Sequence, residues 1–388
     1  MTKRKSAFEK LKECAQSGDS ESQYILAYKY YEGEGIKCSY KEAFKWFSLA
    51  AWQGHNEAQA WLGYLYLWGK GTKINHRIAL KWFKKASHSG NPYAQYNIGM
   101  FYIFGHEVQQ DFRKANHWFK KAAGGGHTSA RYLLAKAYSQ GVGVRRNKKL
   151  AFYWFRQAAM QNHIKAQFEL GRAYSSGFGI KQNNRSAFRW FQKAAQAGNA
   201  KAQSRLAYCY YTGKGIRKDF KKAAHWATLS AEQNCPDGQS ALAGAYLFGN
   251  GVKRNVQKAI KLLDKAANKG DTFSQAYLGY LYWRGLVVKQ DYKKAFSLFK
   301  KASIGGDPKT QMYLGICYHN GQGTRKNYKK SIHWLRLAAK QSNSEAQYFL
   351  GLSYQDGRGV PKNKRTARYW LRKAAASGHK EAIEFLSQ

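Results

Sequence analysis

Histidine is the side chain best suited to proton transfer and metal binding near neutral pH, and seven histidines of this sequence fall at two recurring positions. One position holds His55, His127, His163 and His379, and the other holds His117, His225 and His333. None of them has a second ligand residue at the spacing of a zinc site. Because repetition of a structural unit accounts for both series, we expect no catalytic histidine and no metal site.

Three further patterns could carry chemistry. Ser297 and Lys300 match the Ser-x-x-Lys pattern of a serine nucleophile, but no companion motif accompanies them. The glycine run at 124–126 is not preceded by a strand pattern, as a phosphate-binding loop requires. Five cysteines are scattered without Cys-x-x-Cys spacing, which favours reduced, packed thiols: Cys14, Cys38, Cys209, Cys235 and Cys317. We therefore expect no enzyme and no cofactor.

The charge of the chain is strongly one-sided, with 66 Lys and Arg against 22 Asp and Glu and a net charge of +44. Such a charge attracts acidic proteins, nucleic acids or anionic membranes. A hydrophobic content of 44% is too high for a disordered chain, and no apolar run is long enough to form a transmembrane segment. The first residues also lack the apolar stretch of a secretory signal. We expect a cytoplasmic protein, with export as a bacterial effector left open.

A motif of the form Ala-Gln-x-x-Leu-Gly recurs every 36 residues along the chain. Its Gln position is filled by Gln23, Gln59, Gln95, Arg131, Gln167, Gln203, Gln239, Gln275, Gln311, Gln347 and Ile383. No insertion or deletion interrupts the series, so each unit should occupy the same place in a stack and share a core with its neighbours. The sequence contains no linker that would divide it into domains.

Each unit carries the pattern of two helices joined by a glycine loop. A tyrosine and then a glycine follow the Gln position, the glycine usually as Gly-x-Gly, which ends the first helix in a left-handed turn. Units three and eight have Glu107 and Val287 in place of the second glycine. The pattern Ala-x-x-Trp-Phe-x-x-Ala-Ala then predicts a second helix with one apolar face. We expect its tryptophans in the core: Trp46, Trp82, Trp118, Trp154, Trp190, Trp226, Trp334 and Trp370.

These motifs resemble the Sel-1-like repeat, a relative of the tetratricopeptide repeat. The resemblance covers nearly the whole chain and implies an all-α fold, a right-handed α/α superhelical solenoid of about ten 36-residue helix-turn-helix repeats. We expect a single solenoid over residues 1–388, with an N-terminal capping helix in 1–19, ten tandem repeats in 20–379 and a C-terminal cap helix in 380–388. Proteins of this family are mostly adaptors and scaffolds, which bind partners on the concave side formed by their first helices.

One face of each first helix varies between units and is not needed for stacking. At about 100° per residue, positions +1, +5, +8 and +9 from the Gln lie on this face. It is often aromatic, like the anchors of protein interfaces, and the predicted partner-binding residues are Tyr24, Tyr28, Tyr31, Tyr64, Leu67, Trp68, Tyr96, Met100, Phe104, Tyr208, Tyr211, Phe248, Tyr280, Trp283 and Arg284. Burial between neighbouring repeats is the alternative explanation. The favoured function is a monomeric, non-enzymatic scaffold or adaptor for a protein partner, with an acidic protein as one candidate.

Basic residues also recur in register. Nine of the ten units have a Lys or Arg at the start of the second helix, which predicts a basic ribbon along the loop edge that includes Lys149, Arg185, Lys221, Lys293 and Lys329. Such a ribbon would bind a polyanion, either nucleic acid or an anionic membrane. A solvated edge that keeps the array soluble is the alternative explanation, and no nucleic-acid-binding motif is present. Polyanion binding is therefore the second hypothesis, after protein binding.

Overall fold

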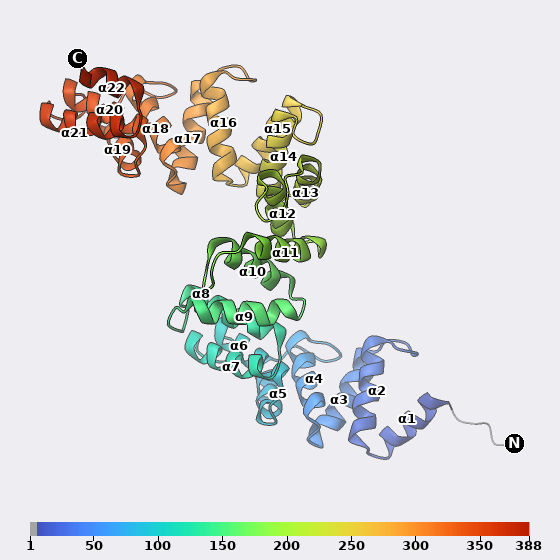
Figure 1. The fold of residues 1–388 in the computed structure, drawn as a ribbon. Coiled ribbons are helices and arrows are strands. Elements are labelled where there is room, and N and C mark those ends of the chain that lie inside the picture. Colours follow the sequence, from blue (N-terminus) through green and yellow to red (C-terminus); the bar gives the residue numbers. More distant parts are fainter. Residues whose placement is uncertain (1–5, 388) are drawn as a thin grey trace. The chain divides into compact units, whose positions relative to one another are not determined.

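The computed structural model describes residues 6–387, which form paired α-helices (Figure 1). Each repeat consists of a first helix, called helix A, and a second helix, called helix B. A further helix, α1 (Ala7–Gln16), precedes the first repeat, and α22 (Lys380–Ser387) follows the last. No strand occurs within 6–387, so the predicted all-α repeat fold is confirmed. Residues 1–5 and 388 of the predicted caps lie outside the described residues.

The helices alternate along the chain. The A helices are α2 (Ser20–Glu32), α4 (Asn56–Trp68), α6 (Pro92–Phe104), α8 (Thr128–Gln140), α10 (Ile164–Ser176), α12 (Ala200–Thr212), α14 (Pro236–Phe248), α16 (Thr272–Arg284), α18 (Pro308–Asn320) and α20 (Ser344–Asp356). The B helices are α3 (Tyr40–Trp52), α5 (His76–His88), α7 (Phe112–Gly124), α9 (Lys148–Met160), α11 (Asn184–Gln196), α13 (Phe220–Glu232), α15 (Val256–Asn268), α17 (Tyr292–Ala302), α19 (Tyr328–Lys340) and α21 (Lys364–Ala376). A short 3-10 turn, η1 (Ser303–Gly305), follows α17.

The chain divides into two compact units, Met1–Ala197 and Gly198–Gln388. Among the described residues, the first unit holds α1 to α11 and the second holds α12 to α22. Within each unit, helix B packs on helix A of its own repeat and on helix A of the next one. A single solenoid over the whole chain stays a prediction.

Polar caps and glycines explain where the helices begin and end. Every helix B starts after an Asn, Asp or Ser whose side chain accepts a hydrogen bond from a backbone N–H of the first turn, for example Asn75 from Ile78. Every helix A ends at a glycine in the left-handed conformation, as predicted. The two ends together fix the length of each loop.

The second glycine of the loop lies against the preceding repeat. A Cβ atom on Gly71 would overlap the backbone carbonyl of Tyr40, the first residue of α3. The loop can therefore approach helix B of the preceding repeat only without a side chain at this position. In units three and eight, Glu107 and Val287 occupy the same left-handed conformation, with φ of 54° and 57°.

The repeated Gln joins neighbouring repeats by hydrogen bonds. The Nε2 atom of Gln59 donates to the Ala51 carbonyl at 3.2 Å, and that of Gln275 donates to the Ala267 carbonyl at 2.9 Å. Within a repeat, a glycine of helix A lets a large side chain of helix B approach closely. A Cβ atom on Gly63 would lie 2.8 Å from the ring of Phe83, which is fully buried. These contacts form the core of each unit.

The tryptophans of helix B are less uniform than expected. Trp46 and Trp82 are buried, as predicted. The other six are half-buried and pack against core clusters: Trp118, Trp154, Trp190, Trp226, Trp334 and Trp370. The Lys121 ammonium lies 4.8 Å from the Trp118 ring centre, and Lys193 lies 4.9 Å from that of Trp190. These two rings thus contact a cation as well as the core residues against which they pack.

Candidate functional site

In the first unit, the predicted partner-binding face includes three exposed aromatic side chains on successive A helices. The exposed fraction is 38% for Tyr28 on α2, 61% for Trp68 on α4 and 61% for Phe104 on α6. The last two are the final residues of their helices and stand beside the glycine loops. Exposed aromatic side chains on successive helices are candidates for an interaction surface.

The other predicted residues of this unit are half-buried between repeats: Tyr24, Tyr31, Tyr64, Leu67, Tyr96 and Met100. The hydroxyl groups of Tyr31 and Tyr64 form a hydrogen bond at 3.3 Å, and both rings contact Trp61, with centroid distances of 4.9 and 5.5 Å. Trp61 also stacks on Phe47 at 5.4 Å. Trp61 lies at position +2, outside the positions predicted to form this face. We call Tyr31, Trp61 and Tyr64 the aromatic cluster.

The tyrosines at position +1 stack on the histidines that begin the next helix A. The ring centroids are 4.7 Å apart for Tyr24 and His55, and 4.3 Å apart for Tyr96 and His127. The Nδ1 atom of each histidine accepts a hydrogen bond from a backbone N–H in the first turn of the helix, that of Ala130 for His127. This helix-capping role accounts for the recurrence of histidine. Burial lowers the pKa of His127 to about 4.

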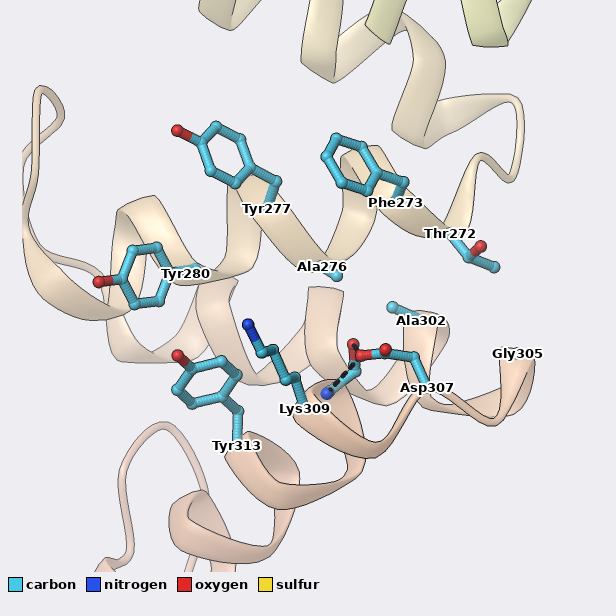
Figure 2. A pocket seen from close by; sticks show the side chains of 11 residues that line it. Thr272, Phe273, Ala276, Tyr277, Tyr280, Ala302, Gly305, Asp307, Lys309 and Tyr313 are labelled. Carbon is cyan, nitrogen blue, oxygen red and sulfur yellow. Dashed lines mark hydrogen bonds between the residues drawn. The ribbon is translucent and has the colours of Figure 1, made fainter. Parts of the chain in front are cut away.

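In the second unit, a hollow of about 570 Å³ lies between α16 and α18. Phe273, Tyr277 and Tyr280 on α16 and Lys309 and Tyr313 on α18 line it, and Figure 2 shows Tyr280 beside Tyr313. The ring centroids of Tyr280 and Tyr313 are 5.6 Å apart, and burial raises the pKa of the Tyr277 and Tyr313 hydroxyls. Apart from Tyr280, these residues occupy positions −2 and +2, which the sequence analysis did not consider.

A second hollow of about 450 Å³ lies along α12 and α14, and we call it the α12–α14 hollow. Three predicted residues line it and are exposed: Tyr208 by 45%, Tyr211 by 44% and Phe248 by 64%. Phe273, which is 64% exposed, borders this hollow and the one shown in Figure 2. The charged residues that line the α12–α14 hollow are Arg205, Asp237 and Asp271. Carboxylates therefore outnumber cations in its lining, although the chain as a whole is strongly basic.

The remaining predicted residues of the second unit lie on α16. Tyr280 and Trp283 are half-buried, and Arg284 is exposed. The indole N–H of Trp283 donates to the Gln322 side chain at 3.0 Å, and its ring lies 5.3 Å from Tyr313. Trp283 therefore takes part in packing between repeats eight and nine.

The predicted basic ribbon is exposed at each of its named residues: Lys149, Arg185, Lys221, Lys293 and Lys329. None of these five forms an ion pair among residues 6–387. The next residue along the chain often has a different environment. Lys222 and Lys294 each pair with the Asp that caps their helix and lie over the ring of a repeat tyrosine. In residues 6–387, the five named ribbon residues thus differ from Lys222 and Lys294, which form ion pairs with the caps of their own helices.

The part of the chain that the structure describes holds no group of three His, Cys, Asp or Glu side chains placed to bind a metal ion. All five cysteines are free thiols, and burial raises the pKa of Cys209 to about 11 and that of Cys317 to about 12. No helix in residues 6–387 is long and apolar enough to cross a membrane.

The Sel1 repeat family model matches ten consecutive segments: residues 20–55, 56–91, 92–127, 128–163, 164–199, 200–235, 236–271, 272–307, 308–343 and 344–379. The chain belongs to the Sel1 repeat family. Each matched segment holds one helix A, its glycine loop and one helix B. Sel1 repeats generally mediate protein interactions, and the family is typically a non-enzymatic scaffold.

Two solved structures of Sel1 repeat proteins are similar over most of the chain. The protective antigen c5321 of uropathogenic Escherichia coli strains, which displays an SLR fold, is 33% identical. That match covers 97% of this chain and 81% of the antigen, with a TM-score of 0.77. A Sel1 repeat protein from Oxalobacter formigenes is 26% identical, with 90% and 92% of the two chains covered and a TM-score of 0.58. A search of curated proteins found no significant match.

Proposed function

We propose that this Sel1 repeat protein is a non-enzymatic scaffold that binds a protein partner on the exposed side chains of its A helices. The observation that carries the proposal is that six of the predicted aromatic residues remain exposed there: Tyr28, Trp68, Phe104, Tyr208, Tyr211 and Phe248. Their full burial in an interface would remove a large apolar area from water, which is the main source of binding energy for such side chains.

The charge of the chain suits an acidic partner. A net charge of +44 creates a long-range field that accelerates encounter with negatively charged proteins. The apolar contacts and the field make separate contributions, because salt screens exposed charges at a distance but leaves apolar burial in place. A change of salt concentration therefore separates the two.

The test is capture of partner proteins from a host-cell lysate on immobilised protein, at about 0.15 and 0.5 M salt. Trp68→Ala with Phe104→Ala, or Tyr208→Ala with Phe248→Ala, should each reduce capture at both salt concentrations. The matched control is Trp52→Ala with Tyr153→Ala, which removes exposed aromatic side chains from B helices. Equal losses in the control pair, or no loss in either A-helix pair, would reject the proposal.

A second candidate function, binding of a polyanion, is supported by the five exposed and unpaired ribbon residues. Contacts to phosphate groups release counterions, so the affinity for nucleic acid would fall steeply with rising salt. Reversal to Glu at Lys149, Arg185 and Lys221 should weaken binding to a 20-nucleotide duplex and flatten its salt dependence. An unchanged salt slope in this triple variant would exclude the ribbon as a binding surface.

A further inference from the structure

The α12–α14 hollow is lined by two small residues of repeat seven at positions where repeat two has large ones. In repeat two, positions +2 and +5 hold Trp61 and Tyr64 of the aromatic cluster, whereas in repeat seven the same positions hold Ala241 and Gly244. Ala241 and Gly244 both line the hollow. The repeat fold itself is unchanged, because α14 has the same length and ends at the same left-handed glycine as α4.

Packing does not explain the glycine. A Cβ atom on Gly244 would meet no atom within 4 Å, whereas one on Gly63 would meet the Phe83 ring. Gly238 on the same helix is also required by packing, because its Cβ atom would overlap the Ser230 side chain. Glycine destabilises a helix interior relative to alanine. At Gly244 the fold gains nothing in return, so the open space itself is the feature to explain.

The lining of the hollow is apolar at one end and acidic at the other. Tyr211 and Phe248 lie in the last turn of α12 and at the last residue of α14, and Asp237 lies in the first turn of α14. The Asp237 carboxylate is exposed and forms no ion pair among the described residues. At a rise of 1.5 Å per residue, Asp237 and Phe248 are about 16 Å apart along the helix, which is the length of about five residues of extended chain.

From this geometry we propose that the α12–α14 hollow binds an extended peptide segment of a partner protein. The segment is about five residues long and carries a bulky apolar side chain at one end and a Lys or Arg at the other. The apolar side chain occupies the space above Gly244 against Tyr208, Tyr211 and Phe248, and the cation lies beside Asp237. The inference rests on the proposed function, because it assigns the kind of segment that one part of the A-helix surface recognises.

The charge of the whole chain does not contradict a basic side chain in the hollow. The net charge acts at long range and favours a partner that is acidic overall, whereas the choice of side chain depends on the groups within contact distance. Of the charged groups there, Asp271 caps α16 by accepting a hydrogen bond from the Ser274 N–H, and Lys214 contacts the Tyr208 hydroxyl at 3.2 Å. Asp237 is the lining carboxylate without an ion pair among the described residues, and Arg205 is the lining cation. An acidic partner that presents one basic residue beside an apolar one satisfies both conditions.

The experiment uses a phage-displayed library of random eight-residue peptides, panned against the full-length protein. We expect enriched peptides to share a large apolar residue and a Lys or Arg about four residues apart. Dissociation constants of the synthesised peptides are then measured by fluorescence polarisation. Gly244→Tyr, which places in repeat seven the residue that repeats one, two, six and eight have at this position, should weaken binding at least tenfold. Asp237→Lys should also weaken it about tenfold.

The matched control is Gly244→Ala, which leaves most of the space open and should change the dissociation constant by less than twofold. Thermal unfolding of each variant shows whether the fold is retained. Failure to enrich any peptide, or enrichment of peptides that bind Gly244→Tyr as tightly as the wild type, would overturn the assignment. If Gly244→Tyr still binds a natural partner that the Trp68→Ala, Phe104→Ala variant does not bind, the hollow is not the binding site of that partner. The proposed scaffold function would still hold in that case.

Discussion

In repeats one and two, aromatic side chains of the A helices contact one another, whereas in repeats six and seven their counterparts border an open hollow. Tyr31 and Tyr211 occupy the same position of the repeat. Tyr31 is half-buried and contacts Trp61, and its hydroxyl donates a hydrogen bond to the Tyr64 hydroxyl. Tyr211 contacts Phe220 and is 44% exposed.

The difference shows that a tyrosine at one position of the repeat can either pack against neighbouring side chains or remain at the surface. What decides between them is the side chains of the following repeat, Trp61 and Tyr64 in one case and Ala241 and Gly244 in the other. The backbone has the same helix lengths in both places. A Sel1 repeat array can therefore gain a binding hollow by two substitutions that leave its stacking intact.

Removal of Trp61, the ring that both other members of the aromatic cluster contact, should have the largest effect on stability. Trp61→Ala should destabilise repeats one and two by about 3 kcal/mol, because it leaves a cavity between Tyr31, Tyr64 and Phe47. Amide hydrogen exchange in α2 and α4 would report the loss locally. Phe248→Ala, at a side chain that is 64% exposed, should cost less than about 1 kcal/mol in α14. Similar costs at the two sites would refute the division into packed and open regions.

Packing requires a glycine at Gly63 but not at Gly244, so substitution to Ala should change stability differently at the two positions. Gly63→Ala forces a Cβ atom to within 2.8 Å of the Phe83 ring, which is fully buried. We expect a loss of about 2 kcal/mol from overpacking, measured by the urea midpoint of the full chain. If Phe83→Leu is added, the smaller side chain should restore part of the loss. No loss in Gly63→Ala would show that helix B can shift freely, contrary to the close packing of this repeat.

The buried ring of His127 should make the first unit sensitive to acid. Burial lowers the pKa of His127 to about 4 from an ordinary value of 6.5, so between these values the unfolded chain binds a proton that the folded chain does not. The stabilisation is complete above about pH 6.5 and is lost as the pH falls toward 4. We expect the loss to be about 1 to 2 kcal/mol, since solvent reaches part of the ring.

The control for the acid effect comes from the chain itself. Asn91, Asn199 and Asn343 cap other A helices through their side chains, so His127→Asn keeps a cap and removes the titrating ring. Urea unfolding at pH 7 and pH 4 should show a smaller acid loss in this variant than in the wild type. Equal acid losses in the two proteins would assign the pH dependence to other groups.

The sequence predicted the helices and loops well because their signals are local. The glycines that were used to predict the end of each helix A lie next to the ends that they fix. The Asn, Asp or Ser caps of the B helices are equally local, although the prediction did not use them. The substitution of Glu107 and Val287 for glycine was also visible, and both residues adopt the left-handed conformation that the loop requires.

The site was harder to predict, because it depends on contacts between repeats. Tyr24 and Tyr96 were assigned to the partner-binding face by their angle on one helix, but each stacks on the histidine of the next repeat. Phe273 and Tyr277 line a hollow from positions that this angle placed elsewhere. A comparison of equivalent positions in neighbouring repeats would have found Ala241 and Gly244, since both stand where repeat two has a large aromatic residue.

The smallest expected change in stability is that of Gly244→Ala, and its sign should be opposite to that of Gly63→Ala. Gly244→Ala should stabilise α14 by about 0.5 to 1 kcal/mol, because alanine has the higher helix propensity and its Cβ atom meets nothing within 4 Å. The urea midpoint of the full chain, or hydrogen exchange in α14, would detect the gain, with Gly63→Ala as the comparison of opposite sign. A loss of stability in Gly244→Ala would mean that the backbone at this position needs glycine, and the hollow would then be a by-product of helix packing. A gain would mean that repeat seven keeps its open space at the expense of its own stability, as expected of a position that serves binding.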